Sequence, residues 1–460
     1  MHIHTIMVVF GLLFGAAALS SLSPLVAPRK QCTYRRQHPA TLLTTSEPRE
    51  AVIPRFLPHR QEPAVLVSPY QAVLNVTRDL GANNPSIQFD GTNFHYHFAR
   101  GDAGWISALE VANKMHIKRI HFPRGTYWFG DYPTVNRSTV VDLSLYPNLH
   151  DGLDVYGDGD EVTTFTSWAP TFDGSMLELS AGAGAQSFAT MSWKMHGMSF
   201  RACAVAFALA VNSPTRQHPR AEHNNLQLYD LYVYNELANN TCHGQAFPKL
   251  PGQVSINAQG ALFAGHIWSS YINVGLATVS TAPSFAPGGS NREDGGDENV
   301  AFNSTGGVVL DEVQYSTLSL RGLGAHNPES FSAPDPTKPN WYPGWGLILR
   351  ANVNSNTVIQ LHCEGSGGCV LIQGGGSFEN RFTSAVMSMM QRALIVSRSP
   401  PPEALSVPNY NVFDGIVVNR YPVRDNATNA THRFSKAVLT EGSPGSLTVQ
   451  HMSVIGDVDA

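Results

Sequence analysis

The stretch 347–396, LILRANVNSNTVIQLHCEGSGGCVLIQGGGSFENRFTSAVMSMMQRALIV, repeats one short pattern three times. Apolar triplets occur as LIL at 347–349, VLI at 370–372 and LIV at 394–396, so their first residues are 23 and 24 positions apart. A period in the low twenties, built from short strands separated by Gly, Asn and Ser, is typical of one turn of a parallel β-helix.

The same pattern extends toward the N-terminus with longer spacings. VVL at 308–310 precedes the next triplet by 39 residues, and ALF at 261–263 lies 47 residues before that, with Pro-rich or Gly-rich insertions in the gaps. A second apolar segment follows three of the triplets at matching offsets, at 317–320, 358–361 and 382–386.

These repeats predict an all-β protein, a right-handed single-stranded parallel β-helix, or solenoid. A single turn of chain cannot bury its inward side chains, so turns stack and pair their backbone N–H and C=O groups with the turns above and below. An antiparallel sandwich or barrel is the alternative, because it also consists of short strands and turns, but it does not require a near-constant period.

The composition agrees with many short strands and turns. Among 460 residues, charged residues make up only 14%, whereas Gly (40) and Pro (30) are plentiful. The formal net charge of −5 gives no electrostatic basis for binding nucleic acid.

The N-terminus carries an apolar segment, IMVVFGLLFGAAAL at 6–19, followed by small residues that fit cleavage after Ser20. We therefore expect residues 1–20 to be a signal peptide, although an uncleaved membrane anchor is the alternative. Residues 21–68 are rich in Pro and Arg and are predicted to form a linker or arm, with the β-helix over 69–460. The expected location is outside the cell, secreted or displayed on a cell or virion surface.

Six N-x-S/T sequons agree with this expectation, because such sites are glycosylated in secreted proteins. They lie at Asn75, Asn136, Asn239, Asn303, Asn426 and Asn429.

One helix is predicted, at 103–115 (AGWISALEVANKM). Trp105, Ala108, Leu109 and Ala112 recur at spacings of three and four, and Asp102 is placed to cap the first turn.

The segments HFPRGTYWF (121–129) and LDVYGDGDEVTTFTSW (153–168) resemble the entry to the first turns of the pectate-lyase superfamily, in particular its pectate-lyase-3-like branch, and of phage tailspikes. The resemblance continues weakly through the repeats to near Asn429. It implies a right-handed parallel β-helix whose N-terminal end is closed by the helix at 103–115. It is specific for fold rather than chemistry, since this fold hosts lyases, hydrolases, epimerases and non-catalytic fibres. The G-H-G and R-I-K segments of pectin hydrolases with this fold are missing from the sequence.

Candidate catalytic residues follow from the repeat. The residues just after the triplets form a predicted column of Ala264, Asp311, Arg350, Gln373 and Ser397. Asp311 beside Arg350 suits binding or deprotonation of a uronate, because adjacent strands lie about 4.8 Å apart. Asp311 with Glu364 forms a possible carboxylate pair for glycoside hydrolysis. A solvated ion pair without function is the alternative for Asp311 and Arg350.

Two insertions supply further candidates. The segment 326–345 contains Trp341, Tyr342 and Trp345, which are predicted to bind sugar together with Gln373, unless the rings only pin the loop. The acidic loop 288–299 is a possible Ca²⁺ site, with a solvated loop as the alternative. No other cofactor or metal is predicted.

The five cysteines are too few for a disulfide scaffold. Cys363 and Cys369 bracket the loop EGSGG and are predicted to form a disulfide, whereas Cys203 lies in an apolar run and is expected to be a buried thiol.

Two functions therefore remain open. The first is a polysaccharide lyase or glycoside hydrolase that acts on an acidic or cell-wall glycan. The second is a structural or adhesive β-helix that binds glycan without cutting it. In either case the expected partner is a polysaccharide, a membrane partner is expected only if the N-terminal segment stays uncleaved, and the protein is a monomer or a homotrimer.

Overall fold

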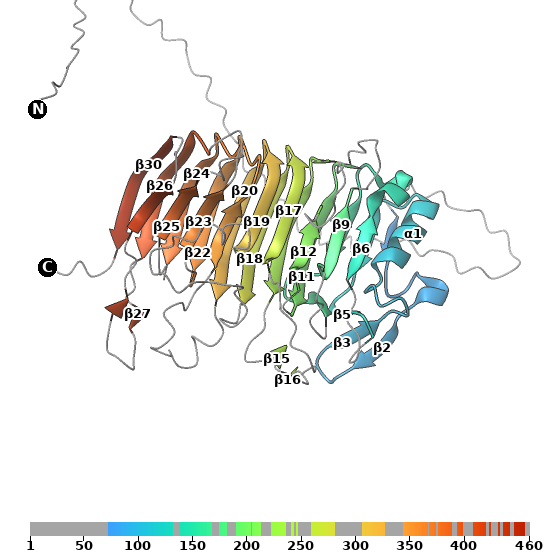
Figure 1. Cartoon of the computed structure of the whole chain (residues 1–460). Helices are drawn as coiled ribbons and strands as arrows, with labels where there is room; N and C mark the ends of the chain where they lie inside the picture. The colour runs from blue at the N-terminus through green and yellow to red at the C-terminus, as the bar shows by residue number, and fades with distance from the viewer. Residues whose placement is uncertain are drawn as a thin grey trace, which may run out of the picture. The chain divides into compact units, whose positions relative to one another are not determined.

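In the computed structural model, strands from successive turns of the chain lie side by side in two stacked parallel sheets, which wind as a right-handed β-helix (Figure 1). The structure describes residues 72–131, 138–167, 174–181, 190–203, 205–212, 222–235, 241–242, 245–246, 259–280, 306–326, 344–366, 368–373, 376–388, 393–398, 408–419, 423–424, 431–432, 436–441 and 446–455. The predicted signal peptide or anchor and the predicted arm lie outside them. Within these ranges no helix is both long and apolar enough to cross a membrane.

One sheet, here called the large sheet, has fifteen strands. In spatial order they are β2 (Ser86–Phe89), β3 (Phe94–His97), β5 (Gly125–Phe129), β8 (Thr163–Ser167), β11 (Lys194–Ala202), β14 (Gln227–Asn235), β18 (Tyr271–Ser280), β20 (Thr317–His326), β22 (Thr357–Glu364), β24 (Arg381–Ser388), β26 (Asn411–Asn419) and β30 (Leu447–Ile455), while β1 (Val73–Asn75), β4 (Arg119–Phe122) and β7 (Asp154–Gly157) pair beside this path. Only the β2–β3 hairpin is antiparallel among them.

The other sheet, here called the small sheet, has eleven strands. They are β6 (Thr139–Asp142), β9 (Leu177–Ser180), β12 (Phe207–Val211), β17 (Gly260–Trp268), β19 (Gly306–Gln314), β21 (Trp345–Leu349), β23 (Gly368–Gln373), β25 (Ala393–Arg398) and β29 (Lys436–Glu441), with β10 (Thr190–Met191) and β13 (His223–Asn224) beside them. Besides one α-helix, the remaining described elements are two short hairpins and three 3₁₀ turns. The hairpins are β15 (Thr241–Cys242) with β16 (Gln245–Ala246) and β27 (Val423–Arg424) with β28 (Thr431–His432), and the 3₁₀ turns lie at Gly81–Asn83, Leu143–Leu145 and Pro147–Leu149.

Each turn of the solenoid runs from a small-sheet strand into a large-sheet strand, as in β17 to β18 or β23 to β24. The predicted triplets lie in neighbouring parallel strands, so the β-helix is confirmed and the antiparallel alternative is excluded for them. Val308 pairs with Leu347, and Leu347 pairs with Val370, as predicted.

At the first and last triplets along the chain, the predicted strand register is wrong by one residue. Leu262, rather than Ala261, pairs with Val308, and Ile395, rather than Leu394, pairs with Val370. The physical reason is that the outward side chains of the small sheet are apolar as well, so the sequence offers no contrast between inward and outward positions to fix the register.

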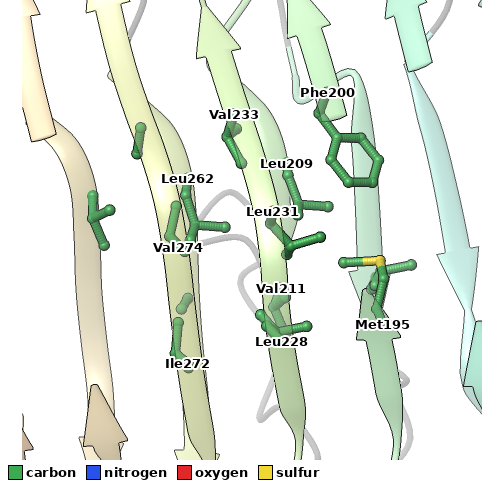
Figure 2. Close-up of a cluster of buried hydrophobic side chains, with 14 of the residues drawn as sticks. Met195, Phe200, Leu209, Val211, Leu228, Leu231, Val233, Leu262, Ile272 and Val274 are labelled. Atoms are coloured by element: carbon green, nitrogen blue, oxygen red, sulfur yellow. The ribbon is translucent and has the colours of Figure 1, made fainter. Parts of the chain in front are cut away.

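Inward side chains of both sheets meet in one continuous apolar core (Figure 2). Leu231 and Val233 of β14 stack beside Val274 of β18 in the large sheet and face Leu209 and Leu262 of the small sheet, and all five are fully buried. This stacking repeats from turn to turn, because every strand alternates its side chains between the two faces.

The helix α1 (Trp105–Met115) lies at the N-terminal end of the stacked strands (Figure 1). Trp105 is 1% exposed and Leu109 is fully buried, as predicted for a cap. The carboxylate of Asp102 accepts hydrogen bonds from the backbone N–H groups of Gly104 (2.9 Å) and Ile106 (3.1 Å), which satisfies donors of the first turn. The helix covers apolar side chains that would otherwise face water where the solenoid begins.

A polar ladder, here called the corner ladder, lines the corner where small-sheet strands turn into large-sheet strands. It consists of Ser270, Ser316, Asn356, Asn380 and Asn411, each at most 5% exposed. The hydroxyl of Ser316 accepts from the backbone of Ser270 (3.0 Å), and the side-chain oxygen of Asn356 accepts from the backbone of Ser316 (2.9 Å). The amide of Asn356 donates to Asn380, and that of Asn380 donates to Asn411, both at 2.9 Å. Buried polar groups at the corner are thus satisfied by the next turn of chain.

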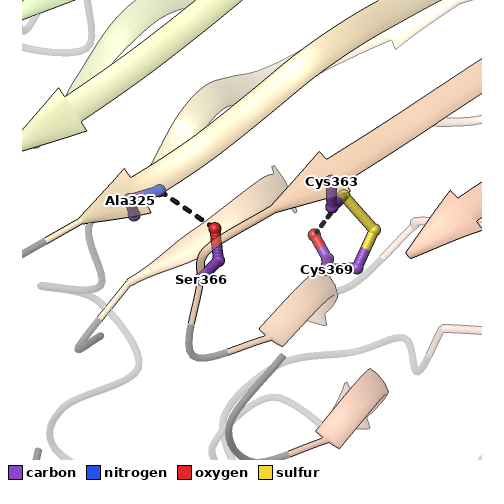
Figure 3. Close-up of a disulfide and its surroundings, with 4 residues drawn as sticks. All are labelled: Ala325, Cys363, Ser366 and Cys369. Atoms are coloured by element: carbon purple, nitrogen blue, oxygen red, sulfur yellow. Dashed lines mark hydrogen bonds between the residues drawn. A yellow bond between two sulfur atoms is a disulfide. The ribbon is translucent and has the colours of Figure 1, made fainter. Parts of the chain in front are cut away.

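Cys363 and Cys369 form a disulfide with an S–S distance of 2.05 Å, which joins β22 to β23 (Figure 3). In the loop between them, the hydroxyl of Ser366 accepts a hydrogen bond from the backbone of Ala325 (3.0 Å). Cys203 is fully buried but is disulfide-bonded, so the expectation of a free thiol there is wrong. Its apolar neighbours in sequence are equally compatible with either state.

Candidate functional site

The predicted column of site residues exists on the outer side of the small sheet, with a corrected register. Gly265, not Ala264, pairs with Asp311, and Gln373 pairs with Arg398, not Ser397. Because Leu310 pairs with Leu349 and Leu349 with Ile372, the residues that follow them, Asp311, Arg350 and Gln373, occupy equivalent positions on successive turns.

The charged residues of this column are partly buried. Burial lowers the pKa of Arg350, and the nearby charge of Asp311 opposes that effect. The Arg350 guanidinium lies 6.0 Å from the ring centroid of Phe263. Gln373 is 8% exposed, and neither its Oε1 nor the Nε of Arg350 has a hydrogen-bond partner among the described residues. The catalytic role of Asp311 and Arg350 stays a prediction.

Glu364 does not join this pair. It ends β22 in the large sheet, just before the turn into β23, whose first residue Gly368 pairs with Trp345. Arg350 follows five residues after Trp345 (350 − 345), so at about 3.3 Å per residue it lies about 16 Å from this end of the strand. The predicted grouping of Glu364 with Asp311 and Arg350 is therefore wrong, because the direction of a turn cannot be deduced from spacing.

The aromatic candidates do not form a sugar platform where the structure describes them. Trp345 is 7% exposed and belongs to a buried apolar cluster that includes Phe207, Phe263 and Ile348, so its predicted contact with sugar is wrong for this structure. Trp341 and Tyr342 lie outside the described residues, as does the acidic loop 288–299. Within the described ranges, no group of three or more His, Cys, Asp or Glu side chains is arranged to hold a metal ion.

Of the six sequons, only Asn75 lies in the described part of the chain. It is 9% exposed, and its Oδ1 accepts hydrogen bonds from the backbone N–H groups of Thr77 (3.1 Å) and Arg78 (3.2 Å). This geometry leaves little room for a glycan on the folded protein. Glycosylation at the other five stays a prediction.

A row of rings on the outer side of the large sheet was not predicted. His121, Tyr156, His196 and Tyr229, here called the His–Tyr ladder, are register partners on β4, β7, β11 and β14. Their neighbouring ring centroids are 4.8, 5.6 and 4.3 Å apart, and each pair is stacked. Stacked rings on adjacent strands form a rigid, partly exposed platform on the sheet.

A carboxylate with positively charged neighbours lies beside the ladder. Asp154 contacts the Nε2 of His196 at 3.1 Å and the guanidinium of Arg119 at 3.5 Å, and Arg119 also lies 5.3 Å from the ring centroid of Tyr156. Burial alone would raise the pKa of Asp154. The hydrogen bond from His196 and the charges of His196, Arg119 and Lys194 outweigh burial and lower the pKa, so this carboxylate is ionised at neutral pH.

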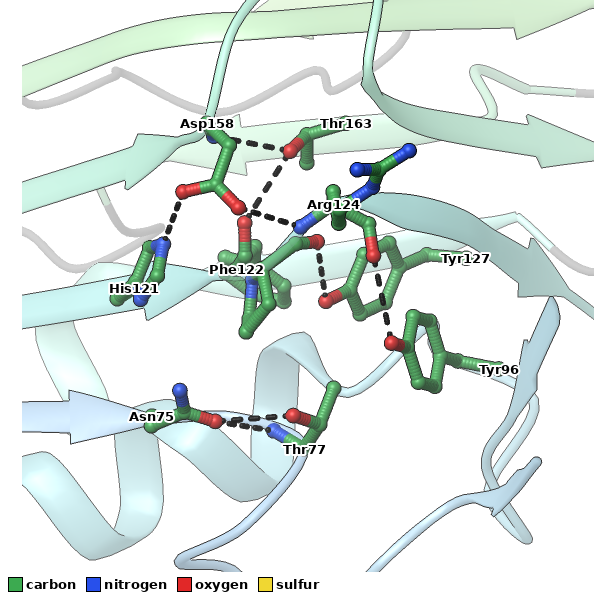
Figure 4. A network of polar contacts seen from close by, with 10 residues as sticks. Asn75, Thr77, Tyr96, His121, Phe122, Arg124, Tyr127, Asp158 and Thr163 are labelled. Carbon is green, nitrogen blue, oxygen red and sulfur yellow. Dashed lines mark hydrogen bonds and ion pairs between the residues drawn. The ribbon is translucent and has the colours of Figure 1, made fainter. Parts of the chain in front are cut away.

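A second His–Asp pair includes His121, the first ring of the ladder (Figure 4). His121 Nε2 is 2.7 Å from one carboxylate oxygen of Asp158, and the other oxygen accepts from the backbone N–H of Arg124 at 2.7 Å. The hydroxyl of Thr163 accepts from the backbone of Asp158 at 2.9 Å, which holds the turn in place. The imidazole is thus oriented by a carboxylate that is itself fixed by backbone contacts.

Two groups with raised pKa values lie close by. Burial raises the pKa of Tyr229, and the charges of Asp154 and Asp230 raise it further, so the phenol is a proton donor. Burial also raises the pKa of Asp160, helped by the charges of Glu161 and Asp230. The ladder therefore combines oriented imidazoles, cations and a protonated phenol on one surface, which are groups used in acid–base catalysis.

A local pattern in the sequence marks the ladder. Each of its rings is the third residue of a tripeptide in which a polar residue is followed by an apolar residue and then by His or Tyr: RIH (119–121), DVY (154–156), KMH (194–196) and QLY (227–229). Their separations of 33 to 40 residues exceed the period of the later repeats, because long insertions interrupt the first turns.

Comparison with known proteins finds similarity of architecture only. No protein-family model matches the chain, and no curated protein matches it. The tailspike protein of E. coli bacteriophage HK620, solved with a pentasaccharide, is 8% identical with a TM-score of 0.43 and is matched over 83% of this chain and 67% of its own. The catalytic domain of a GH87 alpha-1,3-glucanase, solved with nigerose, is 11% identical with a TM-score of 0.37, over 80% of this chain.

This chain spans 54% of that glucanase chain, about half its length. An A-module of a mannuronan C-5 epimerase from Azotobacter vinelandii is 9% identical with a TM-score of 0.30, over 84% of this chain and all of its own. The fold of this chain is established by its own strand pairing, and it is the right-handed parallel β-helix that the resemblance to the pectate-lyase superfamily implies.

Proposed function

We propose that the protein is an extracellular polysaccharide lyase that binds and cleaves a uronate-containing glycan on the outer side of the large sheet, from β4 to β14. The observation that carries this proposal is a pair of His–Asp contacts on the two strands that flank Tyr156. His121 contacts Asp158, and His196 contacts Asp154. Both histidines are partly exposed, with side-chain exposures of 13% and 24%, so a polymer lying on the sheet can reach them.

The proposed chemistry is β-elimination. A base removes the proton on the carbon next to the uronate carboxylate, a double bond forms, the glycosidic C–O bond breaks, and the leaving oxygen takes a proton from an acid. In both pairs Nε2 faces the carboxylate, so Nδ1 is left to accept the proton, while the anionic partner stabilises the imidazolium. Tyr229, whose raised pKa keeps it protonated, is stacked on His196 and supplies the acid.

Positive side chains suit the substrate carboxylate, whose negative charge opposes removal of the adjacent proton. Arg119 and Lys194 are both register partners of Asp154, one on each side of it. A cation close to the developing negative charge lowers the barrier, because its interaction strengthens in the transition state.

The test is incubation of the purified chain with a panel of polyuronides and neutral glycans, with readouts of the absorbance of unsaturated products and of new reducing ends. We expect both signals on at least one polyuronide and none on neutral glycans, with both lost in His196→Ala. New reducing ends without unsaturation would contradict the lyase. Retention of a glycan without either signal would instead support a non-catalytic binding protein.

Hydrolysis is the second candidate, favoured by Asp160. Burial and the charges of Glu161 and Asp230 raise the pKa of Asp160, and glycosidases use two carboxylates with unequal pKa values. Asp160→Asn would then abolish release of reducing ends, whereas the lyase reaction requires His196.

A further inference from the structure

We infer that the outer side of the large sheet carries a second uronate-binding subsite, next to the His–Tyr ladder on the strands β14 to β22. It consists of Tyr232, Asn273, Arg321 and Gln360 and is here called the Arg321 subsite. The inference rests on the proposed function and names where a second carboxylate of the same glycan would bind.

The strand register leads directly from the ladder into this subsite. Tyr229 and Asn273 are neighbours on β14 and β18, because the residues that precede them are paired. Asn273 pairs with Ser319 on β20, and Ser319 pairs with Gln360 on β22. Since adjacent strands lie about 4.8 Å apart, β20 lies three strands, or about 14 Å, from the strand of His196. One glycan lying across the strands can therefore contact both places.

The subsite faces the same side of the sheet as the ladder. The residues on either side of Tyr232, Asn273 and Ser319 are at most 1% exposed and belong to the core, which are Leu231, Val233, Ile272, Val274, Leu318 and Leu320 (Figure 2). Alternation along the strands therefore turns Tyr232 and Asn273 outward, where both are partly exposed. Arg321 and Gln360 are exposed.

The ring of Tyr232 forms an apolar wall of the subsite. It lies against β18 at Gly275, where a Cβ atom would come within 2.4 Å of a ring carbon, so a larger residue would displace the ring. The ring of Tyr234 meets it edge to face, with a centroid distance of 6.5 Å. An aromatic surface that can pack against the C–H face of a sugar is thus in place before a ligand binds.

Two amide side chains offer hydrogen bonds beside this ring. The hydroxyl of Ser319 donates to Oε1 of Gln360 at 3.0 Å, which orients the amide and leaves its two N–H donors for a ligand. The Oδ1 of Asn273 is buried and has no hydrogen-bond partner among the described residues. Rotation of this amide would bring the acceptor to the surface, where a sugar hydroxyl can donate to it.

Arg321 supplies the positive charge. Among the described residues it forms no ion pair, whereas Arg119 contacts Asp154 and Arg381 contacts Asp414. A guanidinium carries five N–H donors and can bind a carboxylate through two of them at once. An exposed arginine without an acidic partner, next to a ring and two amides, therefore suits a uronate better than a neutral sugar.

The experiment is affinity electrophoresis in gels that contain sodium polygalacturonate or sodium alginate, combined with turnover on oligomers of the retained polymer. One oligomer is long enough to reach about 14 Å from His196, and one is too short. We expect Arg321→Met to weaken retention and to raise KM on the long oligomer about tenfold, as for loss of a charged bidentate contact. The value of kcat, and KM on the short oligomer, should stay unchanged.

Further variants test charge and ring separately. Arg321→Lys should keep part of the affinity, and Arg321→Glu should lose more than Arg321→Met, because it repels the carboxylate. Tyr232→Leu should raise KM on the long oligomer by a smaller factor. The matched control is Arg381→Met, which removes another exposed arginine from the outer side of the sheet and should change neither retention nor KM.

Equal retention and KM of Arg321→Met and the wild type would overturn the subsite while leaving the proposed function standing. A loss of the same size in Arg381→Met would also overturn it, because overall charge would then explain the binding. Retention of the wild type without cleavage, lost in Arg321→Met, would support the subsite and overturn the lyase. Failure of the wild type to bind or cleave either polymer would overturn both proposals.

Discussion

The outer sides of the two sheets are built on the same pleat and the same stacking, yet they carry opposite chemistry. On the small sheet the outward column Phe263, Val309, Ile348 and Leu371 is apolar and fully buried. On the large sheet the outward column is the His–Tyr ladder, which has carboxylate partners and is partly exposed. The alternation of side chains therefore defines the interior of the β-helix. The residue types on each outer side decide whether that side is buried and apolar or partly exposed and polar.

The comparison can be tested most strongly by truncating one ring on each face. We expect Phe263→Ala to lower the free energy of unfolding by about 4 kcal/mol, because it deletes a fully buried ring, and Tyr229→Ala to lower it by about 1 kcal/mol. Denaturant unfolding followed by circular dichroism measures both. Similar losses for the two variants would contradict the distinction between the faces.

Catalysis should depend on the large sheet alone. We expect His196→Ala to lower kcat at least a hundredfold and His121→Ala to do so as well, since an oriented general base contributes about 10²–10⁴-fold. The matched control is His451→Ala, which breaks a His–Asp contact of 2.7 Å with Asp414 on the same sheet at the far end of the solenoid. Loss of activity in that control would show that folding, rather than position on the ladder, explains the effect.

The small sheet should respond to acid. Burial lowers the pKa of His223 on β13 to about 4 from 6.5, so between these values the unfolded chain binds a proton more readily than the folded one. Stability is therefore fully present above about pH 6.5 and falls as the pH drops through this window, by about 2 kcal/mol at pH 5.

The measurement is denaturant unfolding at pH 7 and pH 5. His223→Gln should remove this part of the difference, and His116→Gln, which changes an exposed histidine, should leave it intact. A pH dependence that survives in His223→Gln would assign it to other groups.

The smallest expected effect is at Arg350. Its guanidinium lies on the side of the small sheet that we do not assign to catalysis. Burial penalises this cation more than the charge of Asp311 stabilises it, so replacement by an apolar side chain of similar size costs little. We expect Arg350→Met to keep turnover within about twofold and stability within about 1 kcal/mol. A tenfold loss of kcat in a folded variant would return the catalytic role to Asp311 and Arg350.

The sequence was sufficient for the architecture because period and residue size encode it. The repeat at 347–396 predicts the parallel stack, and the spacing of Trp105, Ala108 and Leu109 predicts the capping helix, both of which the structure confirms. The sequence does not define the exact register of the strands, since Ala261 and Leu262 are both apolar and either could face the core.

The candidate site shows the opposite balance. Asp311 and Arg350 were correctly placed on one column, but Glu364 was misplaced because its orientation depends on a turn. His121 and His196 were missed because their closeness arises from strands that are 75 residues apart (196 − 121) and stack only in three dimensions. Long-range pairing of this kind leaves a mark in sequence only as a shared local pattern.

The corner ladder has a consequence for how such a chain can be lengthened and engineered. Connections from the large sheet back to the small sheet range from 365–367 to 281–305, while the opposite corner is crossed in two residues at Ser269–Ser270 and Tyr315–Ser316. Because the ladder bonds all lie at the tight corner, material inserted at the other corner leaves them intact. The molecule therefore has one corner fixed by hydrogen bonds and one permissive corner, and guest loops or whole binding modules grafted at 389–392 should be accepted without loss of the scaffold.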